Sequence, residues 1–288
     1  MGSEMCIRDR VYRVTFGEEV LNRTTLDNGP ERKLYYTPPH TNGSDDDDNT
    51  IYQVSVVYMR AGHDPGEYNE LGHYARLRLE RSHAIKCPPI SAQLAGLKVI
   101  QQALTNPGAV ERFLPAEEAA RVRATFMPIY PLDETPQGLI GREIALDASK
   151  AINYVLKPSL EGGSHNVYRG DIPAYLAKVP KTEWHKYILM EMIQSPQVSN
   201  VLLSSAGMHK GPVISELGVF GFCMWDSRQY QPDPAARDDG DVAPSPPVML
   251  HNHGTDCWSF KTKNRAVDEM SVVKGYGCFD SPMLYDQP

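Results

Sequence analysis

Alternating apolar and polar positions predict a series of β-strands along this chain. Every second residue of 12–16 and of 54–58 is apolar or aromatic, which is typical of strands that bury one face. The segment 187–193 (YILMEMI) and the longest apolar stretch, 213–225, predict two further strands, and 258–263 predicts a last one. Strand patterns therefore recur from one end of the chain to the other.

Apolar residues at helical spacing predict helices between these strands. One stripe is followed by the stop signal Asn106-Pro107-Gly108, and its members are Ile90, Leu94, Leu97, Ile100 and Leu104. Helices are also expected over 117–123 and over 171–179, where Asp171 would cap the first turn. The mixture of strands and helices predicts an α/β (α+β) protein.

Two polar segments predict long surface loops. Residues 22–50 contain Pro-Pro and Asn-Gly pairs and the aspartate run 45–48, and they are expected to form a surface insertion with a solvated tip. Consecutive aspartates lack the alternating spacing of a calcium loop. Residues 226–256 are rich in Pro, Asp and Gly, and His251 and His253 are expected to be exposed there rather than metal ligands.

Composition limits the class of protein. A chain of 288 residues is long enough for about two domains. Its net charge of −7 argues against a general nucleic-acid or anionic-membrane surface. No apolar run could span a bilayer and no signal-peptide pattern is present, so we expect a cytoplasmic protein. Five cysteines without CxxC spacing are expected to be reduced thiols, four of them buried.

The stretch Tyr154–Tyr168 carries the clearest chemistry. Its apolar start predicts a buried strand that ends at Lys157 and Pro158, and a loop with Gly162 and Gly163 follows. Glycines let backbone amides converge on an anion, and an ammonium group supplies the charge that phosphate attracts. The stretch matches neither the P-loop nor the dinucleotide-binding pattern. By spacing alone, a strand and turn with solvated side chains is the commoner explanation.

The sequence of this stretch, YVLKPSLEGGSHNVY, resembles the glycine-rich loop of the eukaryotic-type glutathione synthetases, a family of ATP-grasp ligases whose pattern is near KPxxEGGGNNxY. Further blocks of a fungal-like member follow in the family's order: Tyr58–Gly62, Leu79–Pro88, Gln93–Gly96, Tyr187–Glu191 and Ser215–Gly221. The resemblance runs from near Val11 to the C-terminus and covers roughly the C-terminal half of the family's chain.

The resemblance implies an incomplete Rossmann-like substrate domain followed by an ATP-grasp domain. We expect residues 1–10 to be a non-native leader and 11–105 to be part of the substrate-binding domain. Residues 106–288 are expected to form the ATP-grasp domain, with its glycine-rich loop and a C-terminal lid. Because the family's other metal ligands and some substrate contacts lie upstream of the matching region, the chain alone is expected to be inactive.

An ATP site and a Mg²⁺ ligand are also implied. Glu161 is expected to bind one of two Mg²⁺ ions beside the phosphates. Met190–Ile193 would pair with adenine through its backbone, and Glu216 would meet a nucleotide hydroxyl or a cation, because a carboxylate in an apolar strand is costly to bury unpaired. The residues expected at ATP are Lys98, Lys157, Glu161, Gly162, Gly163, Ser164, His165, Asn166, Tyr168, Met190, Glu191, Met192, Ile193, Glu216 and Lys263.

Substrate contacts are implied after the strand 54–58 and in the C-terminal lid. The residues are Arg60, Ala61, Gly62, His63, Lys261, Val272 and Val273. Three places depart from the family: His63 stands at a usually aromatic position, Lys261 where arginine is usual, and 270–275 lacks a GGVAAG-like pattern. Lysine cannot reproduce a bidentate guanidinium contact, so carboxylate recognition at 261 stays open.

The resemblance implies a reaction that joins γ-glutamylcysteine to glycine through an acyl phosphate. Its catalysis would rest on positioning and charge neutralisation. The resemblance also implies a homodimer. Two alternatives stay open: a catalytically inactive nucleotide-binding fragment, and a related ligase that uses another amino acid in place of glycine. Individual residues also have plainer explanations. Lys98 could be a snorkelling cation beside an apolar stripe, and Met190 or Met192 could pack in the core.

Overall fold

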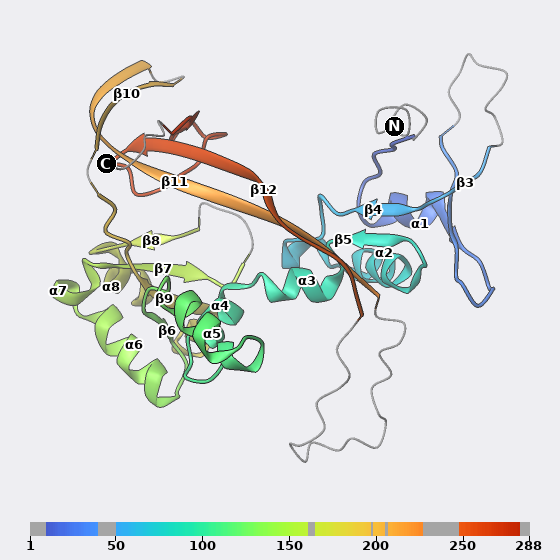
Figure 1. Cartoon of the computed structure of the whole chain (residues 1–288). Helices are drawn as coiled ribbons and strands as arrows, with labels where there is room; N and C mark the ends of the chain where they lie inside the picture. Colours follow the sequence, from blue (N-terminus) through green and yellow to red (C-terminus); the bar gives the residue numbers. More distant parts are fainter. Residues whose placement is uncertain are drawn as a thin grey trace. The chain divides into compact units, whose positions relative to one another are not determined.

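The computed structural model describes residues 10–39, 50–160, 165–196, 198–204, 207–226 and 248–282. Two compact units divide the chain, Met1–Met192 and Ile193–Pro288. The first unit holds three sheets and every helix in the part that the structure describes, and the second holds a four-stranded sheet (Figure 1). The mixed α/β (α+β) class is confirmed, whereas the domain boundaries at 10/11 and 105/106 stay predictions.

An antiparallel sheet lies near the start of the first unit. β1 (Thr24–Leu26), β2 (Leu34–Tyr36) and β3 (Tyr52–Gln53) lie side by side in that order. Leu34 and Tyr36 are buried, so the prediction of a surface insertion over 22–50 is wrong for these strands. The Pro-Pro pair at 38–39 follows β2, whereas Asn42-Gly43 and the aspartate run 45–48 fall outside the described residues.

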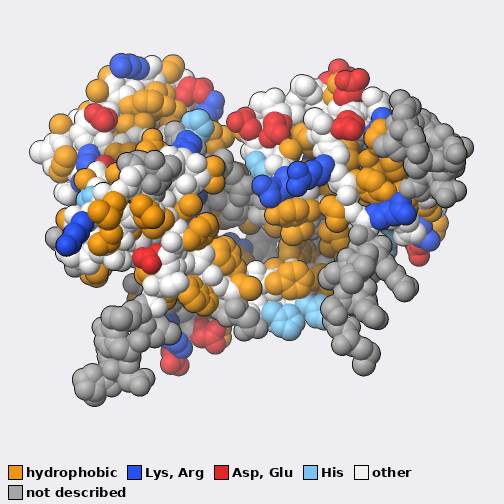
Figure 2. All heavy atoms as spheres, turned by 90° about the horizontal axis from the view of Figure 1, so that it is seen from above, with side chains coloured by type: hydrophobic (Ala, Val, Ile, Leu, Met, Phe, Trp, Pro, Cys, Tyr) orange, Lys and Arg blue, Asp and Glu red, His pale blue; other side chains and the backbone are white. Residues whose placement is uncertain are grey.

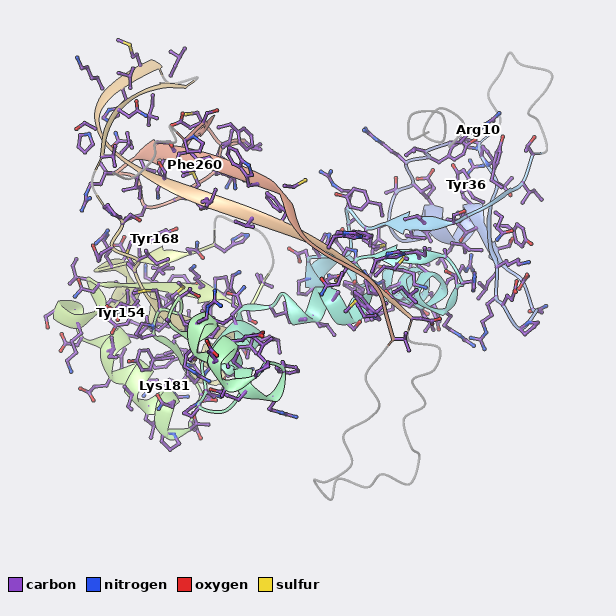
Figure 3. The ribbon with its side chains drawn as sticks, viewed as in Figure 1. Arg10, Tyr36, Tyr154, Tyr168, Lys181 and Phe260 are labelled. Carbon is purple, nitrogen blue, oxygen red and sulfur yellow. The ribbon has the colours of Figure 1, made fainter. Side chains whose placement is uncertain are left out.

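The first predicted strand, 12–16, is also wrong. Among the described residues no strand pairs with this segment, which turns directly into α1 (Glu18–Arg23). The ring of Tyr12 instead packs against those of Tyr36 and Tyr52, at centroid distances of 4.8 and 5.4 Å, and Figure 3 labels Tyr36 in this region. Aromatic packing therefore accounts for the alternation that resembled a strand.

A βαβ unit follows. β4 (Val56–Tyr58) and β5 (Ile85–Cys87) pair in parallel, and α2 (Glu70–Arg81) is the crossover between them. β4 confirms the last three residues of the strand predicted over 54–58, although Val56 and Tyr58, expected on its buried face, are exposed. The core beneath consists of Val20, Leu34, Met59, Ala75, Leu79 and Ala84. One parallel pair does not make a doubly wound sheet, so the Rossmann-like architecture stays a prediction.

The helix predicted over 90–104 is two helices, α3 (Ile90–Ala95) and α4 (Lys98–Leu104). Gly96 ends the first, and Leu97 has extended backbone angles (φ −63°, ψ 148°), so a new helix begins at Lys98. The apolar stripe continues across the break and therefore hid it. The end at Leu104 agrees with the predicted stop signal, and α5 (Ala116–Arg123) confirms the helix expected over 117–123.

A second antiparallel sheet has the order β6-β9-β7-β8. Its strands are β6 (Ile129–Pro131), β7 (Tyr154–Pro158), β8 (Val167–Tyr168) and β9 (Tyr187–Glu191). Leu156 and Leu189 are register partners with no exposed surface, and they pack into one core with residues of the neighbouring helices. Val155 and Ile188, which point to the opposite face, are also buried, so both faces of this sheet are covered.

The helices of this core are α6 (Pro136–Leu146), α7 (Ala148–Ala151) and α8 (Asp171–Leu176). Short 3₁₀ turns complete the unit at η1 (Pro65–Glu67), η2 (Val110–Arg112) and η3 (Lys181–Lys186). α8 is shorter than the predicted 171–179. Its N-cap is Gly170 and no side chain caps it, so the cap predicted at Asp171 is wrong.

The second unit is an antiparallel sheet in chain order. Its strands are β10 (Val198–Ser204), β11 (Gly207–Asp226), β12 (Val248–Asn264) and β13 (Cys278–Asp280). β12 begins well inside the loop predicted over 226–256. His251 and His253 lie on this strand with their rings stacked 6.1 Å apart, and both are exposed, as expected.

Apolar side chains occupy much of the surface seen in Figure 2. In the second unit, Phe220, Phe222 and Trp258 are each more than half exposed. Strands with an open face also expose their cysteines: Cys87, Cys223 and Cys257 are exposed and Cys278 is half-buried, so the prediction of buried thiols is wrong. In the described part of the chain, no helix is long and apolar enough to cross a membrane.

Replacing Leu189 by alanine should lower the free energy of unfolding by about 2–5 kcal/mol, because the side chain is fully buried at the centre of its sheet. Leu139, which is 55% exposed on α6, is the matched control, and Leu139→Ala should change stability by less than about 0.5 kcal/mol. Urea unfolding followed by circular dichroism measures both. Equal losses in the two variants would contradict the assigned core.

Candidate functional site

Two segments far apart in the sequence meet where the predicted phosphate lysines lie. Lys157 is half-buried near the end of β7, and Ser159 follows that strand. The amide of Val99, next to Lys98 at the start of α4, donates to Ser159 Oγ at 3.4 Å. The backbone that carries Lys98 therefore lies beside the end of the strand that carries Lys157.

The predicted glycine-rich loop leaves β7 and returns along β8. Val155 and Tyr168 are register partners in these antiparallel strands, so both ends of the loop are anchored to one strand pair. Asn166 Nδ2 donates to Tyr168 Oη (3.2 Å), and His165 is exposed; Figure 3 labels Tyr168. The members Glu161, Gly162, Gly163 and Ser164 fall outside the described residues.

β9 lies inside its sheet, between β6 and β7, which limits the predicted adenine edge. Met190 is the register partner of both Ile129 and Val155. The amide of Glu191 donates to Pro128 O (3.0 Å) and that of Met192 to Asn153 O (2.9 Å). These backbone donors are already used by the sheet, whereas Ile193 is 64% exposed beyond it.

The predicted substrate segment follows β4 at the carboxyl end of the parallel pair. Arg60 is exposed, and its guanidinium lies 5.9 Å over the ring of Tyr58. Gly62 is buried with φ +77°, and a Cβ there would lie 3.2 Å from Tyr68 Oη and 3.3 Å from Phe16 Cζ. Glycine is therefore required at 62 both by the backbone conformation and by its neighbours.

The carboxylate of Glu67 accepts backbone hydrogen bonds at the end of the segment Arg60–His63. The amides of His63 and Asp64 donate to Glu67 Oε2 at 3.1 and 3.0 Å. These backbone hydrogen bonds, that from Asp64 foremost, lower the pKa of the Glu67 carboxyl, because they stabilise its charged form. The ring Nε2 of His63 lies 3.3 Å from Met59 O. The ring is thus turned back toward the end of β4.

In the second unit, three of the predicted charged residues share one face of the β11–β12 ladder. Glu216 is the register partner of Lys261, and Lys263 lies two residues further along β12. Lys261 Nζ lies 3.4 Å from Glu216 Oε1. The side chain of Glu216 is 53% exposed, so the premise that it is buried and unpaired is wrong: this stretch of β11 is apolar, but its face is open.

Lys263 is the buried cation of this face, with 6% of its surface exposed. Its Nζ donates to Asp268 O at 2.6 Å, in the chain that leads to the predicted lid. Burial lowers the pKa of the Lys263 ammonium, and the charges of Asp268, Glu216 and Glu269 partly oppose that shift. In the segment that follows β12, Val272 is half-buried and Val273 is 98% exposed. Gly275 N donates to Val272 O in a turn of this segment.

Sequence reasoning missed the polar residues that hold these strands together. Ser215 Oγ and Thr262 Oγ1 are 2.9 Å apart, and Thr262 Oγ1 donates to Asp280 Oδ2 at 2.9 Å. Thr262 has no exposed surface. These hydrogen bonds join β11, β12 and β13 on the face of the sheet opposite to Lys261 and Lys263. Its only sequence signal is three hydroxyl or carboxyl residues in separate strands, which no local pattern links.

The structure thus brings the predicted residues together in three groups: the segments of Lys98 and Lys157, the segment Arg60–His63, and the trio Glu216, Lys261 and Lys263. The third group belongs to the second unit. Within the described residues no group of three or more His, Cys, Asp or Glu side chains could hold a metal ion, and the predicted ligand Glu161 lies outside them.

A family model described as "Eukaryotic glutathione synthase, ATP binding domain" matches residues 17–284 of the chain. The glutathione synthetase large chain of Schizosaccharomyces pombe is 43% identical over 233 residues, which are 81% of this chain and 43% of that protein. Human glutathione synthetase is 41% identical over 187 residues, or 62% of this chain and 39% of that protein. The chain therefore spans about two fifths of the length of these relatives.

Among solved structures, a glutathione synthetase-like effector from Globodera pallida in its apo form superposes with a TM-score of 0.57 at 20% sequence identity. The match covers 98% of this chain and 51% of the effector. At this identity the likeness concerns the fold alone.

The lowered pKa of Lys263 gives a prediction for pH dependence. Above the lowered pKa and below the ordinary value of 10.5, the unfolded chain holds a proton that the folded chain has released, so stability rises with pH in that window. Lys263→Met should remove this part of the rise. Thermal unfolding of both proteins at several alkaline pH values tests it, and an identical pH slope in the two would refute the assigned burial.

Proposed function

The chain belongs to the eukaryotic glutathione synthase family, and we propose that it supplies the ATP-binding part of a glutathione-forming ligase. Its substrates would be ATP, γ-glutamylcysteine and glycine. The γ-phosphoryl group of ATP would pass to the C-terminal carboxylate of the dipeptide, giving ADP and an acyl phosphate. The amine of glycine would then attack the acyl carbon, lose a proton and displace inorganic phosphate.

One observation carries this proposal: the start of α4 lies beside the end of β7. Lys98 and Lys157 would hold phosphate oxygens from these two elements. Positioning and charge neutralisation supply most of the catalysis in phosphoryl transfer. A protein nucleophile is therefore not part of the proposal.

Bound Mg²⁺ would supply further neutralisation of phosphate charge. The resemblance predicts two ions, and Glu161 would be a ligand of one of them, since Mg²⁺ prefers carboxylate oxygens. Lys263 and Glu216 are proposed as further nucleotide contacts. Met190–Ile193 remains the adenine edge that the resemblance implies, and since the amides of Glu191 and Met192 already donate within the sheet, Ile193 is the member proposed to contact adenine.

The dipeptide carboxylate is proposed to meet Arg60, whose guanidinium lies at the carboxyl end of β4, where ligands bind in open α/β sheets. Residues 11–105 would then be part of a Rossmann-like substrate domain and 106–288 an ATP-grasp domain. Lys261, Val272 and Val273 would belong to a lid over the substrate, which suits the almost complete exposure of Val273. A cytoplasmic location and a homodimer are proposed from the resemblance alone.

The assay that tests this function incubates the purified chain with Mg-ATP, γ-glutamylcysteine and glycine and measures phosphate and glutathione. Equilibrium binding of ATP is measured in parallel. Binding with product formation supports the ligase, and binding without product supports the inactive nucleotide-binding protein. Replacement of glycine by other amino acids separates the related ligases. Absence of ATP binding would overturn the proposal.

Replacing Lys157 by alanine should weaken the ATP-dependent step by about 10²-fold or more, the scale seen when one preorganised charge contact is lost. Where no product forms, the same comparison is made on ATP affinity. Lys150, exposed on α7 and paired with Glu143, is the matched control, and Lys150→Ala should behave as the unmodified chain. Equal behaviour of the two variants would remove Lys157 from the site.

A further inference from the structure

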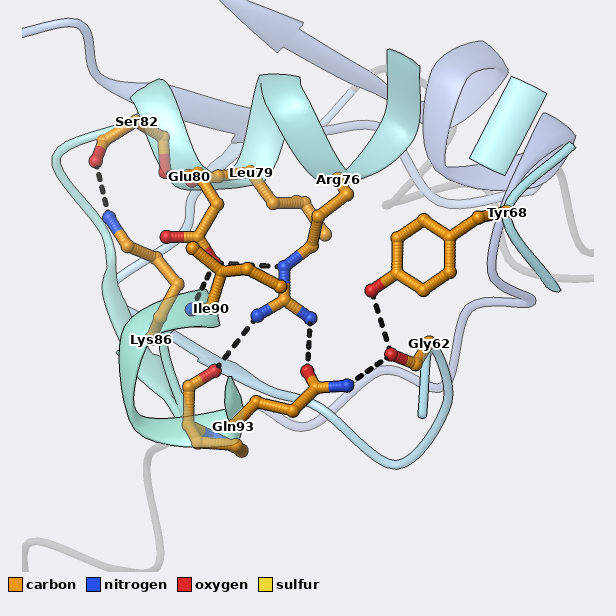
Figure 4. A network of polar contacts seen from close by, with 10 residues as sticks. Gly62, Tyr68, Arg76, Leu79, Glu80, Ser82, Lys86, Ile90 and Gln93 are labelled. Carbon is orange, nitrogen blue, oxygen red and sulfur yellow. Dashed lines mark hydrogen bonds and ion pairs between the residues drawn. The ribbon is translucent and has the colours of Figure 1, made fainter. Parts of the chain in front are cut away.

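Behind the segment Arg60–His63, two side chains converge on one carbonyl oxygen. Gly62 O accepts a hydrogen bond from Tyr68 Oη at 2.7 Å and another from Gln93 Nε2 at 2.6 Å (Figure 4). Gly62 lies in the left-handed region and is buried, so its carbonyl has a fixed direction. Both lone pairs of this oxygen are thereby used by side chains that come from outside the segment.

Gln93 is itself held from the other side. Arg76 Nη1 donates to Gln93 Oε1 at 2.9 Å, Arg76 Nε donates to Glu80 Oε1 at 2.9 Å, and Nη2 lies 3.5 Å from Pro88 O. Arg76 is 5% exposed and Gln93 8%. Glu80 Oε1 also accepts the amide of Ile90 at 2.9 Å, at the start of α3.

The donor and acceptor capacities of Arg76, Gln93 and Gly62 O allow this series of hydrogen bonds to run in one direction only. A guanidinium can only donate, so the amide of Gln93 must turn its oxygen toward Arg76. Its NH₂ group then points at Gly62 O, which can only accept. Reversing the amide would place its NH₂ group against the donor Arg76 Nη1 and its oxygen against the acceptor Gly62 O. The orientation of the Gln93 amide is therefore set by its two neighbours, Arg76 and Gly62.

We propose that Gln93 is a positioning residue for the ligand-binding segment Arg60–His63, with Arg76 fixing Gln93 and Tyr68 sharing the Gly62 carbonyl. By holding that carbonyl, Gln93 sets the path of the backbone between the guanidinium of Arg60 and His63. Gln93 touches no reacting atom. This inference rests on the proposed function for the identity of the ligand, a dipeptide carboxylate, but not for the hydrogen bonds themselves.

Gln93→Glu removes the donor of the side-chain amide and keeps its acceptor, so the two hydrogen bonds are tested separately. The carboxylate still accepts from Arg76, and its second oxygen cannot donate to Gly62 O. Tyr68→Phe removes the other donor to the same carbonyl and keeps the ring. The matched controls are Gln102→Glu, a glutamine equally buried at 8% that donates to Asn106 Oδ1 instead, and Tyr74→Phe, an exposed phenol on α2.

Amide hydrogen exchange of the full chain is the primary measurement. Gln93→Glu and Tyr68→Phe should each speed exchange at residues 60–63 by about tenfold, the size of one net hydrogen bond, while β7 and β9 are unchanged. The two controls should leave 60–63 unchanged. Unaltered exchange at 60–63 in Gln93→Glu would overturn the proposal. If Gln93→Glu unfolds the chain, Gln93→Met, which also removes the donor to Gly62 O but adds no charge, decides by the same criterion.

Ligand affinity is the second measurement. Gln93→Glu should raise the dissociation constant for γ-glutamylcysteine by about tenfold and change that for ATP by less than about twofold. Equal weakening of both ligands would show a general structural role and overturn the positioning role. If the unmodified chain binds neither ligand, the proposed function fails, and the exchange measurement still decides whether Gln93 holds the segment.

Discussion

A guanidinium group removed from water is the constraint on which the βαβ part of the chain depends. The side chain of Arg76 is buried, and an unpaired buried charge costs several kcal/mol or more. Its partners are Glu80, one turn along α2, the carbonyl of Pro88 after β5, and Gln93 of α3. Because each partner comes from a different place in the chain, satisfying this charge fixes α2, α3 and the end of β5 together.

The same constraint reaches the surface where a ligand is proposed. Gln93 accepts a hydrogen bond from Arg76 and donates one to Gly62 O. Gly62 in turn lies between Arg60, which is exposed, and His63. A flexible, solvated arginine therefore sits on a backbone whose conformation is fixed from behind. At the other proposed site, the start of α4 and the end of β7 are joined through Ser159, so the two predicted phosphate lysines also depend on contacts made by their neighbours.

In the second unit, the alternation of strands separates two kinds of chemistry. One face of β11 and β12 carries Glu216, Lys261 and the buried Lys263, and the other carries the hydroxyl chain through Thr262. An apolar pattern states which residues share a face but not whether that face is covered. For this reason the burial expected for Glu216 and for the cysteines was wrong, whereas the strands themselves were predicted.

By itself the sequence determined the strands β4, β7 and β9, the helix α5 and the family, because strand period, helix signals and motif wording are all local. Only the tertiary structure decided the break at Gly96, the path of 12–16, which pairs with none of the described strands, the burial of Lys263 and the meeting of Val99 with Ser159. These depend on partners that lie far away in the chain, and pairing, desolvation and contact are properties of the neighbours, which no local pattern contains.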